Sequence, residues 1–150
     1  DEKAEIAKAN GCTHTIVTSR ENIAQRVREI TDGKGVPVVY DSVGKDTLEA
    51  SLDCLQPRGT LVSNGTSSGA VVLDTKLLAA KGSIWLTRPA MVHYIHPRSH
   101  MLSMADELFD HVLAGRIVSE PQQSFALADA AEAHRALEGR KTTGATVLVP

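Results

Sequence analysis

The sequence predicts an α/β fold, a doubly wound parallel sheet, from three observations. Short apolar runs alternate repeatedly with segments of helical periodicity, and no hairpin signal joins neighbouring runs. Residues 36–43 (VPVVYDSV) are apolar on both faces up to Asp41, as in parallel strands that helices cover on both sides. The length of 150 residues fits a single domain.

The first predicted helix covers residues 1–10 (DEKAEIAKAN), which are rich in helix formers. Gly11 follows where a C-terminal glycine ends a helix. Residues 15–18 (TIVT) form a short β-branched run, and this pattern predicts a buried strand.

A second helix is expected to begin after Ser19, which is a suitable N-terminal cap. Ile23, Val27 and Ile30 recur at i, i+4 and i+7, so this helix has one apolar face. Gly33 ends it, and the strand of residues 36–43 comes next.

Leu48, Leu52 and Leu55 predict a third helix, which Pro57 terminates. Residues 60–63 (TLVS) then form a strand. A turn-rich loop (64–69, NGTSSG), a short helix (74–81) and another strand (83–87, SIWLT) follow in the chain.

The last third of the sequence begins with an irregular segment over residues 88–96, because prolines punctuate it. A longer helix follows and stops at Gly115, and residues 118–125 are predicted to be loop or a short extended piece. Residues 128–138 are predicted to be helical, and residues 145–149 (ATVLV) form a final strand. The longer helix is expected to turn these residues inward: Leu102, Leu108, Phe109, Val112 and Leu113.

Composition excludes several function classes. The 16 basic and 18 acidic side chains give a net charge of -2, so neither a nucleic-acid footprint nor a polybasic membrane anchor is expected. No apolar run approaches the ~20 residues that cross a bilayer. Cys12 and Cys54 have no CxxC spacing, so we expect a reduced, cytoplasmic setting in which both thiols are small core residues.

A ligand site is expected beyond the carboxyl ends of the strands, where parallel sheets bind ligands. Small, hydroxylated or glycine residues dominate these ends, and either a ligand site or simple turn formation accounts for any one of them. Asn64 and Thr66 suit a carboxamide or a ribose, and Arg88 offers a cation. Asp41 has the position of a general base, but a structural role is preferred because no second catalytic partner lies nearby in the sequence. No GxGxxG or GxxxxGK[ST] loop is present.

The stretch VVYDSVGKDTLEASLDCLQPRGTLVSNGTSSG resembles the zeta-crystallin-like quinone oxidoreductases of the medium-chain dehydrogenase/reductase superfamily, as do KGSIWLTRPAMVHYI and DAAEAHRALEGRKTTGATVLVP. The resemblance runs from about Lys3 to Pro150. It implies a Rossmann-like nucleotide-binding domain that is incomplete, with strands one and two, the glycine loop and the catalytic domain absent from this chain. Residues 1–150 would then be a partial nucleotide-binding domain, and residues 123–150 would return toward the absent domain.

The same resemblance implies NADPH as the cofactor. Lys3 matches a lysine that pairs with the 2′-phosphate, although a solvated lysine is the alternative, and Thr18 replaces a tyrosine found beside that phosphate in many members. Arg140 matches an arginine that reaches back to the cofactor, the alternative being a surface arginine. The remaining expected cofactor contacts are Ser42, Asn64, Gly65, Thr66, Ser67, Leu86, Thr87 and Arg88.

The implied activity is hydride transfer from NADPH to a quinone or a similar small electrophilic carbonyl compound. An enoyl reductase or alcohol dehydrogenase of the same superfamily and a non-catalytic NADPH-binding module are the alternatives. No catalytic residue is assigned in this chain, which is expected to be inactive alone, and no metal site is expected, since His93, His96 and His100 lack a completing ligand. A homodimer through the edge strand of residues 83–87 is predicted.

Overall fold

The computed structural model describes residues 2–118 and 120–150. Asp1, in the first predicted helix, and Ser119, in the predicted segment 118–125, lie outside the described residues. The chain divides into two compact units, Asp1–Tyr94 and Ile95–Pro150, which are described separately below.

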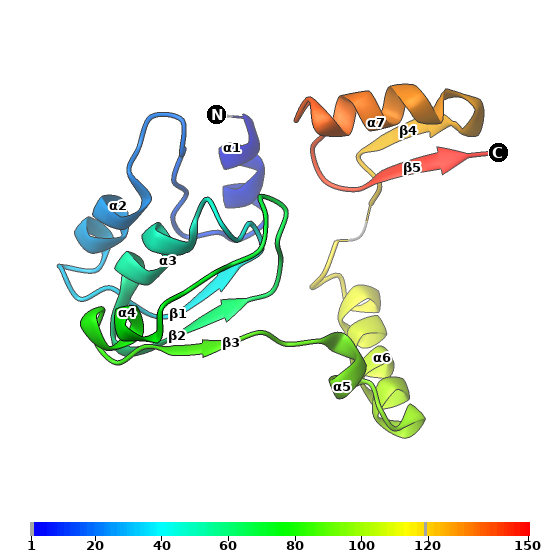
Figure 1. The fold of residues 1–150 in the computed structure, drawn as a ribbon. Helices are drawn as coiled ribbons and strands as arrows, with labels where there is room; N and C mark the ends of the chain where they lie inside the picture. Colours follow the sequence, from blue (N-terminus) through cyan, green and yellow to red (C-terminus); the bar gives the residue numbers. More distant parts are fainter. Residues whose placement is uncertain (1, 119) are drawn as a thin grey trace. The chain divides into compact units, whose positions relative to one another are not determined.

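The first unit is built on a three-stranded sheet in the order β1-β2-β3 (Figure 1). All neighbouring strands are parallel, and Asp41 pairs with Ser63 while Val62 pairs with Thr87. The carboxyl ends of the three strands therefore meet at one edge, which confirms the predicted parallel α/β fold. The strands are β1 (Val36–Asp41), β2 (Leu55–Ser63) and β3 (Trp85–Thr87).

Local capping explains where two helices of this unit begin, α2 (Ile23–Ile30) and α4 (Thr75–Ala80). Asn22, not the expected Ser19, caps α2, because its side chain accepts a hydrogen bond from the Gln25 amide at 3.0 Å. Asp74 caps α4 in the same way through the Lys76 amide at 2.9 Å. The helices of the unit are α1 (Glu2–Ala9), α2 (Ile23–Ile30), α3 (Leu48–Cys54), α4 (Thr75–Ala80) and α5 (Met91–Tyr94). The turn of α5 lies in the segment that was expected to be irregular.

An aliphatic core forms on one face of the sheet. Leu52 of α3 and Leu55 and Leu61 of β2 are fully buried there with Ile84. The opposite face of β1 is not covered within the described residues of this unit, and Tyr40 remains 75% exposed. The expectation that both faces of this strand are covered is thus not met there, because apolar periodicity shows which faces can be buried but not which element covers them. Partly buried aliphatic residues pack against this core: Val36, Val39, Leu48, Leu73, Leu77 and Leu78.

The predicted strand over residues 15–18 is wrong. The Val17 amide donates to the Glu21 carboxylate at 2.7 Å, and the Val17 carbonyl accepts from the Arg20 and Glu21 amides at 3.0 Å. The Val17 amide and carbonyl are therefore hydrogen-bonded within the following turn and not in a β-ladder. No described residue pairs with this segment as a strand. A strand requires a partner, which local sequence does not reveal.

Other boundaries shift by a few residues for local reasons. β1 ends at Asp41, two residues early, since that side chain hydrogen-bonds to the next turn. β2 begins at Leu55 directly after α3, upstream of Pro57. Ser83 takes a left-handed conformation (φ 59°), so β3 begins at Trp85 and not at residue 83.

The second unit contains a long helix and a small parallel pair of strands. The predicted helix ending near Gly115 is confirmed, but its expected inward residues Leu102, Leu108, Phe109 and Leu113 are exposed. The predicted final helix and strand are also confirmed, and a short strand lies in the segment described as loop or extended. The elements are α6 (Arg98–Leu113), β4 (Gln123–Ala126), η1 (Leu127–Asp129), α7 (Ala130–Glu138) and β5 (Thr146–Val149).

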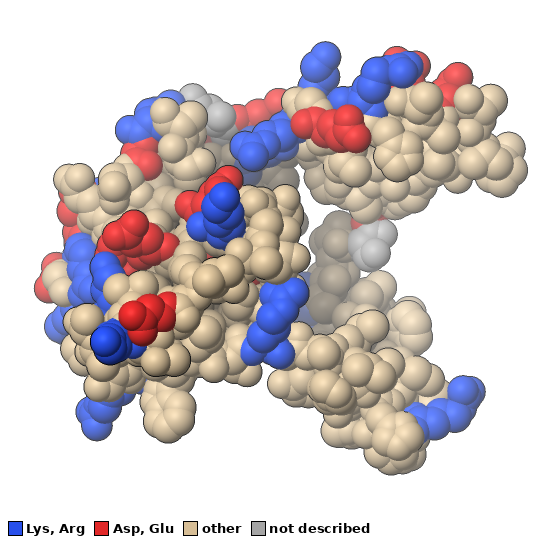
Figure 2. All heavy atoms as spheres, in the orientation of Figure 1, with Lys and Arg blue, Asp and Glu red and all other residues tan. Residues whose placement is uncertain are grey.

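Acidic and basic side chains are mixed over the face of the first unit that Figure 2 shows. Among the described residues, no helix has both the length and the apolar character that crossing a bilayer requires.

Candidate functional site

The candidate site is the edge where β1, β2 and β3 end. Two turns follow these strands, one over residues 42–47 and the other over residues 64–69. Ser42, Asn64 and Thr66 are exposed on these turns, whereas Asp41 and Ser63 beneath them are buried. The site therefore presents hydroxyl and amide groups to solvent over a buried polar base.

The Asp41 carboxylate organises the first turn. It is 7% exposed, and Oδ1 accepts hydrogen bonds from the amides of Val43 at 2.8 Å and Gly44 at 3.0 Å. The Thr47 hydroxyl donates to both carboxylate oxygens at 2.9 and 2.8 Å, and the Ser51 hydroxyl donates to Oδ2 at 2.7 Å. Burial alone would raise the pKa of Asp41, but these hydrogen bonds outweigh it and hold the pKa below its ordinary value.

The two turns are hydrogen-bonded to each other. Ser68 donates to the Val43 carbonyl through its amide and its hydroxyl, both at 2.9 Å, and its hydroxyl accepts from the Asp46 amide at 3.0 Å. The Asn64 amide donates to the Asp41 carbonyl at 2.9 Å. Each turn thus fixes the position of the other.

Gly65 and Ser42 are in direct backbone contact. A Cβ atom added to Gly65 would lie 2.0 Å from the Ser42 carbonyl oxygen, so no side chain fits there. Ser67, on the same turn, donates to that carbonyl at 3.4 Å. Glycine is therefore required at position 65 for the turns to approach, whatever ligand they bind.

Arg88 connects β3 to the end of β2. Its Nη1 donates to the Ser63 carbonyl at 3.1 Å and to the Gly65 carbonyl at 3.3 Å. The side chain that was expected to offer a cation to the cofactor is thus bound to backbone in this structure. Leu86 and Thr87 end β3 next to it, and both are exposed.

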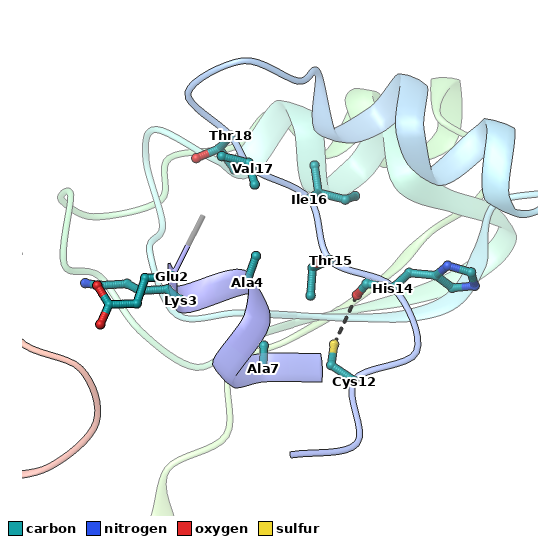
Figure 3. A pocket seen from close by; sticks show the side chains of 10 residues that line it. All are labelled: Glu2, Lys3, Ala4, Ala7, Cys12, His14, Thr15, Ile16, Val17 and Thr18. Carbon is teal, nitrogen blue, oxygen red and sulfur yellow. Dashed lines mark hydrogen bonds between the residues drawn. The ribbon is translucent and has the colours of Figure 1, made fainter. Parts of the chain in front are cut away.

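Lys3 and Thr18, two further predicted cofactor contacts, line one cavity of about 640 Å³. The cavity lies between α1 and residues 12–18 (Figure 3). In the close-up, Ala4 and Ala7 point from α1 toward the facing segment, and their small size leaves the hollow open. The structure places the predicted phosphate-binding lysine and the threonine at the same site.

The structure divides the predicted cofactor residues into groups. Lys3 and Thr18 share the cavity, and Arg140 is exposed in the second unit with a left-handed backbone (φ 55°). The hydrogen-bonded strand-end group contains Ser42, Asn64, Gly65, Thr66, Ser67 and Arg88, with Leu86 and Thr87 beside it in sequence.

The cysteines and histidines depart partly from expectation. Cys54 is buried, and that burial raises the pKa of its thiol, but Cys12 is exposed and donates through Sγ to the His14 carbonyl at 3.0 Å. His134, for which a core position was expected, is exposed beside a cavity of about 140 Å³ that Leu137 also lines. Within residues 2–118 and 120–150, no three His, Cys, Asp or Glu side chains gather as a metal site requires.

Sequence reasoning missed several contributors to the site, among them Thr47 and Ser51, which hold the Asp41 carboxylate, and Ser68 and Gly44. Ser68 joins the turns, and Gly44 donates its amide to Asp41 while an added Cβ would lie 2.7 Å from the Gly69 carbonyl oxygen. Both residues lay within segments already identified as strand ends or turns. The hydrogen bond from Ser68 to Val43 and the close contact between Gly44 and Gly69 could not be seen in the sequence, because each joins residues 20 or more positions apart.

Comparison with known proteins shows the family to which the chain belongs. A family model described as "Zinc-binding dehydrogenase" matches residues 10–148. The chain is 53% identical to a quinone oxidoreductase of Pseudomonas aeruginosa (99% of this chain, 46% of the relative). It is 48% identical to a 2-haloacrylate reductase of Burkholderia sp. (100% and 46%).

Among solved structures, the Escherichia coli quinone oxidoreductase complexed with NADPH matches with a TM-score of 0.92 at 45% identity, over 99% of this chain and 47% of that chain. The chain spans slightly less than half the length of these relatives. The expected resemblance to quinone oxidoreductases is confirmed, and the chain belongs to the family described as zinc-binding dehydrogenases.

Proposed function

We propose that this chain is the nucleotide-binding part of an NADPH-dependent oxidoreductase that transfers a hydride to a quinone or a similar small electrophilic carbonyl compound. The observation that carries the proposal is the hydrogen-bonded edge formed by Ser42, Asn64 and Thr66 at the carboxyl ends of parallel strands. The NADPH in the 45% identical Escherichia coli structure supports the choice of cofactor.

The chemistry of the described residues fits NADPH at two places. Exposed hydroxyl and amide groups on Ser42, Asn64 and Thr66 suit the ribose and carboxamide of the nicotinamide half. The Lys3 ammonium and the Thr18 hydroxyl line a cavity and suit the 2′-phosphate of the adenosine half. Both places belong to the first unit of the chain.

When bound, NADPH supplies the hydride, and a quinone that also takes a proton from water becomes the hydroquinone while NADP⁺ remains. The residues of this chain bind and orient; we assign none of them a proton transfer. The close backbone contact between Gly65 and Ser42 keeps the ligand-facing edge narrow and fixed.

We propose that residues 123–150 contact the substrate-facing part of the whole protein.

The proposal is tested by following NADPH oxidation by the intact protein with benzoquinone, an enoyl thioester and an aldehyde as acceptors. We expect benzoquinone to be reduced with the highest kcat/KM. Faster reduction of the thioester or the aldehyde would support the enoyl reductase or alcohol dehydrogenase alternative. NADPH binding without turnover of any acceptor would support a non-catalytic module.

A second acceptor class is favoured by one comparison. The Burkholderia relative, 48% identical to this chain, is a 2-haloacrylate reductase, and a 2-haloacrylate is an activated alkene. 2-Chloroacrylate therefore belongs in the same assay. A higher kcat/KM for it than for benzoquinone would assign this protein to the second class.

We also propose that the protein is a homodimer joined through β3, which is an edge strand of its sheet with Trp85 69% exposed. Ile84→Pro is a poor test, because Ile84 is buried and its amide donates to the Leu78 carbonyl at 3.0 Å. Trp85→Glu places like charges at the contact and is expected to give monomers by light scattering. Val72→Glu, at a residue 89% exposed outside the strand, is the matched control. An unchanged dimer in Trp85→Glu would contradict the proposal.

A further inference from the structure

Asp41 is the buried acid whose part in the proposed function is still open. Four neutral donors surround its carboxylate: the amides of Val43 and Gly44 and the hydroxyls of Thr47 and Ser51. With Oδ1 and Oδ2 both engaged and the side chain buried, the carboxylate is poorly placed to receive a proton from a substrate. Its geometry instead suits holding a turn.

We propose that Asp41 is a positioning residue, whose carboxylate fixes the turn of residues 42–44 against the turn of residues 64–69 and thereby sets the affinity for the dinucleotide. This inference rests on the proposed function for the identity of the ligand only. The fixing of the turn stands on the geometry of this chain.

The contacts form a continuous path from Asp41 to the exposed edge. The carboxylate holds the amides of Val43 and Gly44, and the Val43 carbonyl then accepts both hydrogen bonds from Ser68. The Asp41 carbonyl accepts the Asn64 amide at 2.9 Å. One residue is thus bonded to both turns through its side chain and its backbone.

Removing the carboxylate would leave the amides of Val43 and Gly44 and the Ser51 hydroxyl without their acceptor, of which Gly44 and Ser51 are buried, whereas the Thr47 hydroxyl also donates to the Gly44 carbonyl at 3.3 Å. Buried donors without acceptors are costly, so the turn would rearrange to reach water. Such a rearrangement moves Ser42, the exposed residue between Asp41 and Val43, away from Gly65. The expected consequence is weaker binding of the cofactor and not a slower chemical step.

Alanine and asparagine at position 41 differ in a useful way. Asparagine keeps a carbonyl oxygen for the Val43 and Gly44 amides, and its NH₂ group can donate to Thr47 and Ser51, whose hydroxyls rotate to accept. Alanine keeps neither acceptor. A positioning role therefore predicts that asparagine rescues much of what alanine loses, while a role that needs a titrating carboxylate predicts equal loss.

The test uses Asp41→Ala and Asp41→Asn in the intact protein, with Leu77→Ala as a control. Leu77 packs against the core from α4 and reports what general destabilisation does to binding. The measurements are amide hydrogen exchange at residues 43, 44 and 68, the Kd for NADPH, and the steady-state constants, which are the KM for the acceptor and kcat at saturating NADPH.

In Asp41→Ala we expect faster exchange at residues 43, 44 and 68, and a Kd for NADPH about tenfold higher, the equivalent of one charge-assisted hydrogen bond. The KM for the acceptor and kcat at saturating NADPH should stay within about twofold, because only binding is affected. Asp41→Asn should restore the Kd to within about threefold. If Asp41→Ala does not fold, Ser51→Ala takes its place, with a Kd about fivefold higher, because it removes only one of the four donors to the carboxylate.

Several outcomes would overturn the inference. These are unchanged exchange at residues 43 and 44 in Asp41→Ala, a loss of affinity no larger than that of Leu77→Ala at equal Tm, or no rescue by asparagine. If the wild-type protein itself binds no NADPH, the proposed function fails, yet the exchange measurement still decides whether Asp41 holds the turn.

Discussion

The two parts of the candidate cofactor site are built differently. At the carboxyl ends of β1 and β2, Asp41, Ser68 and Arg88 join the turns through hydrogen bonds that span 20 or more residues. At the other part, α1 faces residues 12–18 across a cavity of about 640 Å³, and the Val17 amide and carbonyl are hydrogen-bonded to Arg20 and Glu21 of the next turn. The first part is held by long-range bonds, and the second by local ones.

This difference indicates where sequence changes should act. A site fixed by long-range hydrogen bonds loses both stability and affinity when one contact is altered, because neighbouring contacts depend on it. A site formed by exposed side chains on locally bonded segments loses only the contact that is removed. The predictions below test this contrast.

The largest effect is expected for Gly65→Ala, because its Cβ would lie 2.0 Å from the Ser42 carbonyl oxygen. Separating the two turns should cost about 3 kcal/mol in the free energy of unfolding, as for severe overpacking. Gly11→Ala is the matched control: Gly11 lies after α1 with nothing within 4 Å, so the substitution costs only the strain of its left-handed backbone (φ 95°), about 1 kcal/mol. Denaturant unfolding of the intact protein measures both.

Equal losses in these two glycine variants would show that the turns at the strand ends are no more constrained than the end of α1. That result would remove the contrast between the two parts of the site.

A smaller effect is expected for Lys3→Ala, which removes an exposed ammonium from the rim of the α1 cavity. The Kd for NADPH should rise about fivefold, as for one exposed ion pair, with no change for NADH. Lys8→Ala is the control, since Lys8 lies on the same helix and pairs with Glu5 at 3.0 Å. Fluorescence titration of both cofactors provides the measurement. A similar loss for NADH would refute the assignment of Lys3 to the 2′-phosphate.

The smallest effect concerns pH. The pKa of Asp41 in the folded protein lies below its ordinary value of 3.8, so its ionised form stabilises the fold above that value. This contribution should be lost as the pH falls from about 3.8 through the folded pKa, because the unfolded chain then binds the proton more readily. Asp41→Asn should remove that part of the slope in unfolding free energy against pH.

Glu29→Gln serves as a comparison, since exposed Glu29 also has a lowered pKa through hydrogen bonds from Arg26 and Gln25. An unchanged slope in Asp41→Asn would mean that the carboxylate is not preferentially ionised in the fold.

Much of the first unit could be predicted from local sequence. The periodicity of Ile23, Val27 and Ile30 identified α2, and the apolar run up to Asp41 identified β1. Asn64 and Thr66 were predicted to follow the carboxyl end of a parallel strand, and in the structure they follow the end of β2. These predictions held because they depend on neighbours within one turn or one strand.

Other features depend on distant partners and could not be predicted. Residues 15–18 have a strand composition, yet they form no strand because no described residue pairs with them. Leu108 and Phe109 lie on an apolar face of α6 that stays exposed within the described residues. The hydrogen bonds of Arg88 to the Ser63 and Gly65 carbonyls were also not predicted, because only the fold brings these groups together.

The account is tested most directly by amide hydrogen exchange of the intact protein during an NADPH titration. We expect protection to increase at residues 42–44, 64–68 and 86–88, with half-saturation at the Kd for NADPH found by fluorescence. Protection that develops elsewhere, while these three segments exchange as in the free protein, would contradict a dinucleotide site at the ends of β1, β2 and β3.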